Sequence, residues 1–129
     1  MGKTGLVVEG GGMKCAYNAG ILDRFLDENI HFDYCIGVSA GSANVASYLA
    51  GQRDRNLRFY TQHTTLPEYM GVRNFLRTGQ FFGLQFIYGT LTNTGGADPI
   101  DYPAIMANPS EYELVATDTE TGEATYFNK

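Results

Sequence analysis

The segment Gly-Val-Ser-Ala-Gly at positions 37–41 constrains the fold of this chain more than any other part of the sequence. It follows an apolar run at 34–36 and precedes small residues with helical spacing. A serine between a strand and a helix, with glycines two positions before and after it, is typical of a nucleophile elbow. Gly37 and Gly41 leave room where strand and helix crowd together, and the helix points its positive end at the serine oxygen. The motif predicts a strand–turn–helix unit with Ser39 as a nucleophile. The alternative is tight strand–helix packing in which Ser39 only caps the helix.

A second glycine-rich turn, Gly-Gly-Gly-Met-Lys at 10–14, follows the apolar run 6–8. Apolar residues then recur at intervals of three and four over 15–26, which predicts a helix directly after the turn. Consecutive glycines let backbone N–H groups point at a bound anion, and the helix adds its positive end. The bound group is either a phosphate or the oxyanion of an acyl-transfer intermediate.

Two phosphate-binding motifs can be tested by spacing. A Walker A loop fails because Met13 precedes the lysine and Cys15 follows it, where Ser or Thr is required. The dinucleotide fingerprint fails because its third glycine falls on Cys15. An oxyanion hole one βα unit before a nucleophile elbow explains both motifs, and anion or nucleotide binding is kept as an alternative.

The pattern along the chain predicts alternating strands and helices. The expected elements are a strand at 6–9, a helix at 14–28, a strand at 33–38, helices at 39–51, 53–64 and 99–107, and a hairpin at 112–127. Two successive βα units predict an α/β fold with parallel neighbouring strands. Both glycine motifs then lie at the carboxyl ends of their strands, where open α/β sheets build binding sites. No linker divides the chain, so we expect a single domain at 1–129.

The two motifs, together with Tyr-Asn-Ala-Gly-Ile-Leu at 17–22, resemble the N-terminal part of a patatin-like phospholipase of the bacterial type. The segment 112–127 also resembles the family's hairpin. This resemblance implies an α/β fold, namely a three-layer α/β/α sandwich with a mainly parallel sheet, truncated here relative to the full patatin-like fold. It also implies hydrolysis of fatty-acyl esters of phospholipids or lysophospholipids, with no cofactor.

The resemblance also implies roles for individual residues. Ser39 becomes the catalytic nucleophile, and Lys14 becomes a supporting positive charge. Gly37 and Gly41 shape the elbow. The oxyanion hole is assigned to four consecutive residues of the glycine-rich loop, Gly10, Gly11, Gly12 and Met13. Cys15 departs from the family, which usually has glycine at that position.

One element of the family's site is missing from the sequence. The family pairs its serine with an aspartate in a D-G-[GA] motif downstream of the hairpin, and none of the seven aspartates here precedes a glycine. We therefore expect the isolated chain to be inactive or nearly so. Neither histidine is expected to replace the aspartate: His31 is predicted to lie in a solvated loop and His63 on the surface. None of Asp98, Asp101 and Asp118 is expected to be catalytic. Asp98 precedes Pro99 in a turn-like segment, and Asp118 is expected to cap the backbone of the hairpin turn.

Composition narrows the possible partners. The net charge is −5 and no stripe of Lys or Arg is present, which argues against nucleic acid. No apolar stretch reaches about 18 residues, and the N-terminus enters a strand rather than a signal peptide. Cys15 and Cys35 are expected to be small buried hydrophobes of a reducing compartment, so we expect a cytoplasmic location. No cluster of Cys, His or carboxylates predicts a metal site.

The segment 71–96 combines aromatic residues with glycines and allows several interpretations. It could form an apolar lid or acyl-chain groove, pack as the core of an irregular cap or helix pair, or expose a patch for self-association or transient membrane contact. Core packing is favoured. Arg73 and Arg77, four residues apart, suit either phosphate head groups or a solvated helix face. The main alternative to a lipid hydrolase is a non-catalytic module that binds lipid or a partner.

Overall fold

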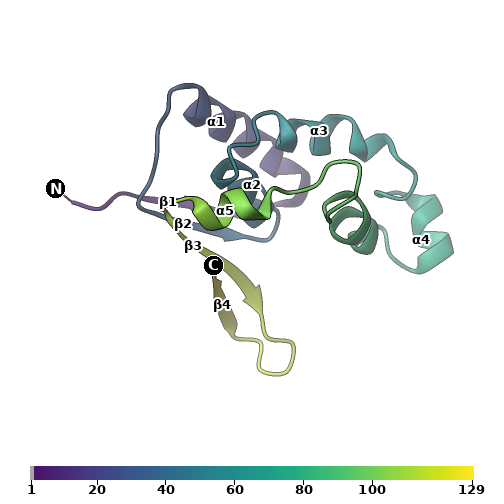
Figure 1. The fold of residues 1–129 in the computed structure, drawn as a ribbon. Helices are drawn as coiled ribbons and strands as arrows, with labels where there is room; N and C mark the ends of the chain where they lie inside the picture. Colours follow the sequence, from purple (N-terminus) through teal and green to yellow (C-terminus); the bar gives the residue numbers. More distant parts are fainter. Residues whose placement is uncertain (1) are drawn as a thin grey trace. The chain divides into compact units, whose positions relative to one another are not determined.

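The computed structural model describes residues 2–129 and divides them into two compact units (Figure 1). The first unit comprises residues 2–56 and 101–129, and the second comprises Leu57–Ile100. Helix α3 (Arg55–Thr61) begins in the first unit and continues into the second. Each unit has its own hydrophobic cluster.

The first unit is built on one four-stranded sheet in the order β1-β2-β3-β4. Its strands are β1 (Gly5–Val8), β2 (Tyr34–Val38), β3 (Glu111–Thr117) and β4 (Ala124–Asn128). The pairs β1–β2 and β2–β3 are parallel, and β3–β4 is an antiparallel hairpin. The predicted α/β class with a mainly parallel sheet is confirmed.

Two helices of the first unit follow β1 and β2, and a third precedes β3. They are α1 (Ala16–Asp27), α2 (Ala40–Leu49) and α5 (Tyr102–Ala107). The helix expected at 14–28 is divided, because the glycine-rich loop first closes into the 3₁₀ turn η1 (Gly12–Cys15). Helix α5 begins at Asp101, whose carboxylate accepts a hydrogen bond of 3.0 Å from the Ala104 N–H. Asp101 is therefore the N-cap residue of α5.

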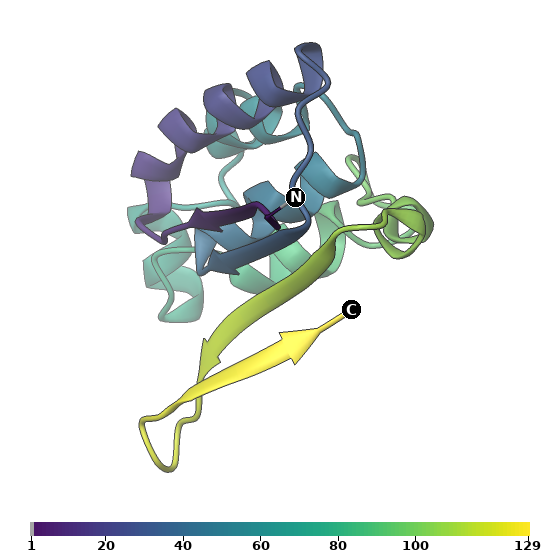
Figure 2. The same ribbon diagram turned by 90° about the vertical axis from the view of Figure 1, so that its left-hand side faces the viewer.

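The helices α1 and α2 pack on the same face of the sheet (Figure 2). Leu22 of α1 and Val45 of α2 are buried against Val8 of β1 and Cys35 of β2. This alternation follows from the period of two in a strand, which turns every second side chain toward the helices. On the opposite face, Val7 is 74% exposed.

The second unit contains three short helical segments after α3. They are η2 (His63–Thr65), α4 (Val72–Thr78) and the π-helix η3 (Gln85–Leu91). Its buried cluster consists of Phe59, Tyr69, Ile87 and Leu91. The expected core packing of segment 71–96 is therefore confirmed for Ile87 and Leu91. It is wrong for most of the other large apolar residues there, which are exposed: Phe75, Leu76, Phe81, Phe82, Leu84 and Tyr88.

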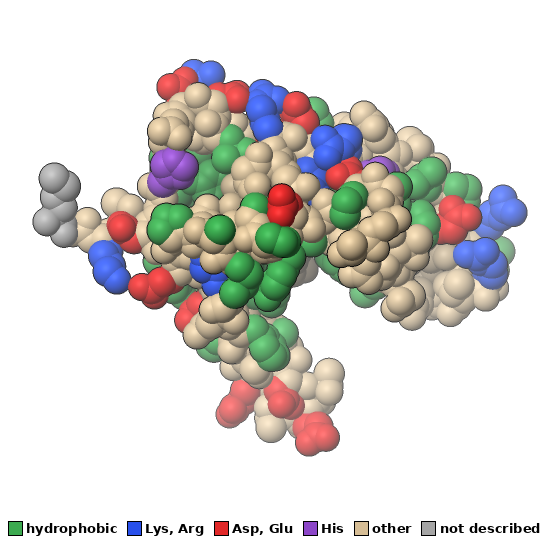
Figure 3. All heavy atoms as spheres, viewed as in Figure 1, with side chains coloured by type: hydrophobic (Ala, Val, Ile, Leu, Met, Phe, Trp, Pro, Cys, Tyr) green, Lys and Arg blue, Asp and Glu red, His purple; other side chains and the backbone are tan. Residues whose placement is uncertain are grey.

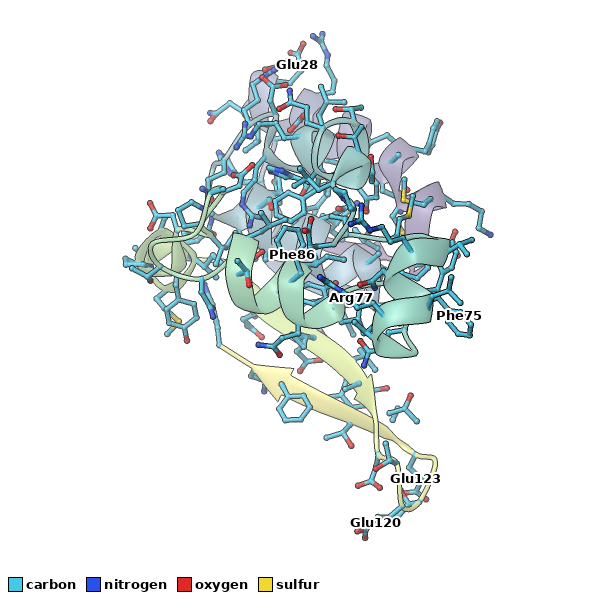
Figure 4. All side chains as sticks on the ribbon, turned by 90° about the vertical axis from the view of Figure 1, so that its right-hand side faces the viewer. Glu28, Phe75, Arg77, Phe86, Glu120 and Glu123 are labelled. Atoms are coloured by element: carbon cyan, nitrogen blue, oxygen red, sulfur yellow. The ribbon has the colours of Figure 1, made fainter. Side chains whose placement is uncertain are left out.

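The β3–β4 hairpin closes through a turn organised by Asp118. Its carboxylate accepts hydrogen bonds from the backbone N–H groups of Glu120 (2.8 Å) and Thr121 (2.9 Å). These two bonds hold the pKa of Asp118 below its usual value. The capping role expected from the sequence is confirmed. Acidic side chains, including Glu120 and Glu123, gather at the tip of the hairpin (Figures 3 and 4).

Candidate active site

The strand register brings the two glycine motifs together. Val8 of β1 pairs with Gly37 of β2, so the residues that follow each strand leave the sheet side by side. Gly10 then lies against Ser39: a Cβ atom added to Gly10 would stand 2.8 Å from Ser39 Cβ and 3.5 Å from Ser39 Oγ. Only glycine lets the loop approach the serine this closely.

Ser39 has a strained backbone at the junction of β2 and α2. Its φ of 53° and ψ of −130° lie in a region that residues with a side chain rarely adopt. The side chain is exposed and caps no N–H group of α2, so hydrogen bonding gives no support to the capping alternative. The turn is instead closed by Ser42, whose backbone N–H donates to the Ser39 carbonyl at 3.0 Å.

The two elbow glycines stand where a side chain would collide with backbone. A Cβ at Gly37 would lie 2.4 Å from Ser42 Cα, and one at Gly41 would lie 2.4 Å from the Glu9 carbonyl oxygen. Both contacts are with main chain that cannot turn aside. The spacing of the motif therefore reflects the close packing of β1, β2 and α2 behind the serine.

The glycine-rich loop uses conformations that favour glycine. Gly11 has a φ of 155° and Gly12 a φ of 55°. The Lys14 N–H donates to the Gly11 carbonyl at 3.2 Å, which closes the turn into η1. Met13 and Lys14 have exposed side chains, so the loop places its one cation in solvent beside the elbow.

Two side chains that the sequence did not single out fix the elbow helix in place. Asn44, buried in α2, donates from Nδ2 to the Cys15 carbonyl at 2.8 Å and so ties the elbow helix to the end of the loop. Tyr112 of β3 donates to the Ser42 carbonyl at 2.8 Å. In the sequence, the only indication that Asn44 has a special role is that it is the single amide among the small and apolar residues of that helix.

The cysteine in the loop is not poised to react. Burial, and then the negative charge of Glu9, raise the pKa of the Cys15 thiol, while Lys14 opposes the shift. Its Sγ donates to the Glu9 carbonyl at 3.5 Å. Burial also raises the pKa of Cys35 to about 11. Both cysteines are buried and unpaired, as expected.

The aspartates of the first unit have structural partners away from the serine. Asp23 accepts from the Asp54 N–H, Asp27 pairs with Arg53, and Asp33 accepts from the Thr4 N–H at 2.7 Å. Within the described part of the first unit, no group forms a hydrogen bond with Ser39 Oγ. The described part of the first unit therefore brings Ser39 and the glycine-rich loop together and places no candidate base within hydrogen-bond distance of Ser39 Oγ.

The two histidines differ in their surroundings. His31 is exposed, with Nε2 2.9 Å from Asn29 Oδ1, which confirms its expected place in a solvated loop. The expectation of a surface side chain is wrong for His63 in the second unit, which is only 14% exposed. Its Nε2 lies 3.0 Å from a carboxylate oxygen of the buried Asp98, which Arg58 also binds through two N–H groups at 2.7 and 2.9 Å.

The patatin-like phospholipase family matches residues 6–112, which include both glycine motifs, all of β2 and nearly all of β1, and end at the start of β3. The uncharacterized protein YjjU of Escherichia coli (strain K12) is 31% identical over 87 residues, which are 67% of this chain and 24% of that protein. The aligned region thus spans about a quarter of the relative.

No solved structure matches the chain. Among residues 2–129, no helix is long and apolar enough to cross a membrane. The match to the family covers most of the sequence and includes the elbow, the glycine-rich loop and their strands. The chain therefore belongs to the patatin-like phospholipase family.

Proposed function

We propose that this chain is the nucleophile-bearing part of a serine hydrolase that cleaves fatty-acyl esters of phospholipids or lysophospholipids. The observation that carries the proposal is the strained, exposed Ser39 held against Gly10. Strain of this kind is kept where the surrounding structure enforces it, and it concentrates at functional sites. Membership of the patatin-like family supports a lipid ester as the substrate.

In the proposed reaction, Ser39 Oγ attacks the ester carbonyl and forms a tetrahedral intermediate. The backbone N–H groups of the loop at 10–13 stabilise the oxyanion, and Lys14 adds a positive charge nearby. The serine proton passes to a base and then to the departing alcohol as the ester bond breaks. Water hydrolyses the acyl-serine and releases the fatty acid. No D-G-[GA] motif is present in these 129 residues, so the proposal assigns the base to an aspartate outside them.

Covalent labelling with a fluorophosphonate probe tests the nucleophile. Ser39 Oγ displaces fluoride from phosphorus, and intact-mass analysis with peptide mapping locates the adduct. We expect one adduct at Ser39, lost in Ser39→Ala and retained in Ser42→Ala, a matched change three residues away. The proposal fails if a folded chain, and a version extended to include a D-G-[GA] motif, both remain unlabelled. A non-catalytic lipid- or partner-binding module would then be favoured by the exposed apolar residues of the second unit.

Two further expectations stay predictions of the sequence: that residues 1–129 are the N-terminal portion of a single patatin-like domain, and that the protein is cytoplasmic. The division into two compact units does not test the single-domain prediction, because one domain can contain more than one compact unit.

A further inference from the structure

Helix α4 in the second unit has its polar side inward. Its one buried residue is Asn74, which donates from Nδ2 to the Gln80 carbonyl at 2.7 Å. Val72, Phe75 and Leu76, spaced to share one face, are exposed, Phe75 by 51% and Leu76 by 79%. Because successive residues of an α-helix turn by about 100°, Val72 and Asn74 stand on opposite sides. The apolar face of α4 therefore points away from the unit that carries it.

The apolar surface continues beyond the helix. The Gly71 N–H donates to the Phe81 carbonyl at 3.0 Å, and Met70 forms a β-bridge with Phe82, so both phenylalanines lie next to the start of α4. Their rings contact edge to face with centroids 5.4 Å apart, and both remain exposed. We call this surface the α4 patch; its residues are Val72, Phe75, Leu76, Phe81 and Phe82.

Positive charge lies along one edge of the patch, on the side of α4 between Leu76 and Asn74, in a chain that is negative overall. Arg73 and Arg77 lie one turn apart on α4 and form no ion pair with the residues that the structure describes. Over positions 66–97 the only other charged residue is Glu68. The two arginines and Glu68 line a small pocket together with Pro67 and Asn74. Figure 3 shows basic and hydrophobic side chains together over α4, and Figure 4 shows Phe75 and Arg77 on this helix.

We propose that the α4 patch docks this protein on the surface of a membrane containing anionic phospholipid. The apolar side chains would enter the boundary between head groups and acyl chains, and Arg73 and Arg77 would bind lipid phosphates. An exposed apolar face bordered by arginines is the arrangement that interfacial helices use, and it complements an anionic surface. This inference deepens the proposed function, because it supplies the route by which a lipid hydrolase reaches its substrate.

A second copy of the chain fits the patch less well. A twofold interface would pair the patch with itself and bring four arginines together with only two glutamates from position 68. A phosphate-rich surface instead supplies a counter-charge for every arginine.

Vesicle flotation tests the proposal on the full 129-residue chain. All proteins carry Ser39→Ala, so that binding is measured without hydrolysis and does not depend on whether Ser39 is the nucleophile. The vesicles contain phosphatidylcholine alone or with about one third phosphatidylglycerol. We expect binding to the anionic vesicles that weakens when salt is raised to about 0.5 M, where charges are screened within a few ångströms.

Matched variants test whether vesicle binding depends on the α4 patch rather than on hydrophobicity or net charge in general. Arg73→Gln with Arg77→Gln should lower the partition coefficient on anionic vesicles about 25-fold, roughly fivefold for each arginine. The control pair Lys3→Gln with Arg24→Gln makes the same change in net charge and should have little effect. Phe75→Ser should weaken binding, whereas Phe127→Ser, at a residue 55% exposed in β4, should not.

Three results would overturn the proposal. They are no binding to anionic vesicles by a folded chain, equal losses in the patch variants and their controls, or a dimer in solution that the patch variants dissociate. The last result would assign the surface to a second copy. Circular dichroism checks that each variant is folded.

Discussion

At the scale of single residues, two helical glycines have opposite surroundings. A Cβ at Gly41 in α2 would lie 2.4 Å from the Glu9 carbonyl oxygen and 2.5 Å from that of Val8, whereas one at Gly20 in α1 would meet nothing within 4 Å. We expect Gly41→Ala to lower the free energy of unfolding by about 3 kcal/mol or more, because β1 must move. Gly20→Ala should raise it by about 0.5–1 kcal/mol. Urea unfolding measures both, and equal effects would contradict the packing described for the elbow.

Buried tyrosines predict a loss of stability at high pH. Burial is the main cause that raises the pKa of Tyr48 to about 12 from its ordinary value of 10, and its hydroxyl donates to the Ile30 carbonyl. The folded state therefore keeps a proton that the unfolded state releases. Stability is unaffected by this group below pH 10 and falls between pH 10 and about 12, by up to about 1.4 kcal/mol per pH unit.

Tyr48→Phe removes the titrating hydroxyl. The unfolding free energy of the variant should therefore decline less steeply above pH 10 than that of the wild type. It should also be about 1 kcal/mol lower at neutral pH, because the hydrogen bond is lost. Urea titrations at pH values on both sides of 10 give the two slopes. Parallel slopes would show that Tyr48 does not titrate differently in the two states.

Residues differ in how far the sequence reveals their roles. The roles of Gly37 and Gly41 follow from their distance to Ser39 along the chain, because a strand–turn–helix unit is local. The partnership of His63 with Asp98 spans 35 positions and depends on where η2 meets the segment that follows η3, so no local pattern indicated it. The hydrogen bond from Asn44 to the Cys15 carbonyl is likewise not visible in a local pattern, because the two residues lie 29 positions apart in the chain.

At the scale of elements, Asn44 joins the elbow helix to the glycine-rich loop. Asn44→Ala should leave the Cys15 carbonyl without its partner and lower the free energy of unfolding by about 1–3 kcal/mol. If the bond also sets the position of the loop, labelling of Ser39 by the fluorophosphonate should slow by more than the loss of folded protein explains. Asn18→Ala, at a partly exposed position of α1, is the control. Unchanged labelling of the folded Asn44→Ala protein would limit Asn44 to a structural role.

Element boundaries show where sequence patterns succeed and fail. The strands and the hairpin begin and end close to their expected positions, because alternation and glycine turns are strong local signals. The spacing of Val72, Phe75 and Leu76 is that of a buried helix face, yet the structure buries Asn74 instead. The amide of Asn74 satisfies the Gln80 carbonyl in the following turn, an interaction that hydrophobic periodicity does not register.

At the scale of the whole molecule, the two units have separate cores, one containing Leu22 and the other Leu91. Both leucines are nearly fully buried, so truncation to alanine should cost each core about 2–5 kcal/mol. We expect Leu91→Ala to increase amide hydrogen exchange mainly within 57–100, and Leu22→Ala mainly within α1, α2 and the parallel strands. Exchange that rises equally in both units for either variant would mean that they unfold as one cooperative body.

The rate at which the chain can hydrolyse an ester depends on the catalytic groups present in the whole molecule. We expect the preformed loop and elbow to be enough for a fluorophosphonate to label Ser39, because the probe is more electrophilic than an ester. Turnover of an ordinary fatty-acyl ester additionally needs a base, and general-base catalysis contributes about 10²–10⁴-fold to the rate. We therefore expect a version extended to include a D-G-[GA] aspartate to hydrolyse esters about 10²–10⁴ times faster than the 129-residue chain. Replacing that aspartate by asparagine should abolish the gain while leaving the fold intact. Equal turnover by the two versions would mean that the 129 residues already contain the base.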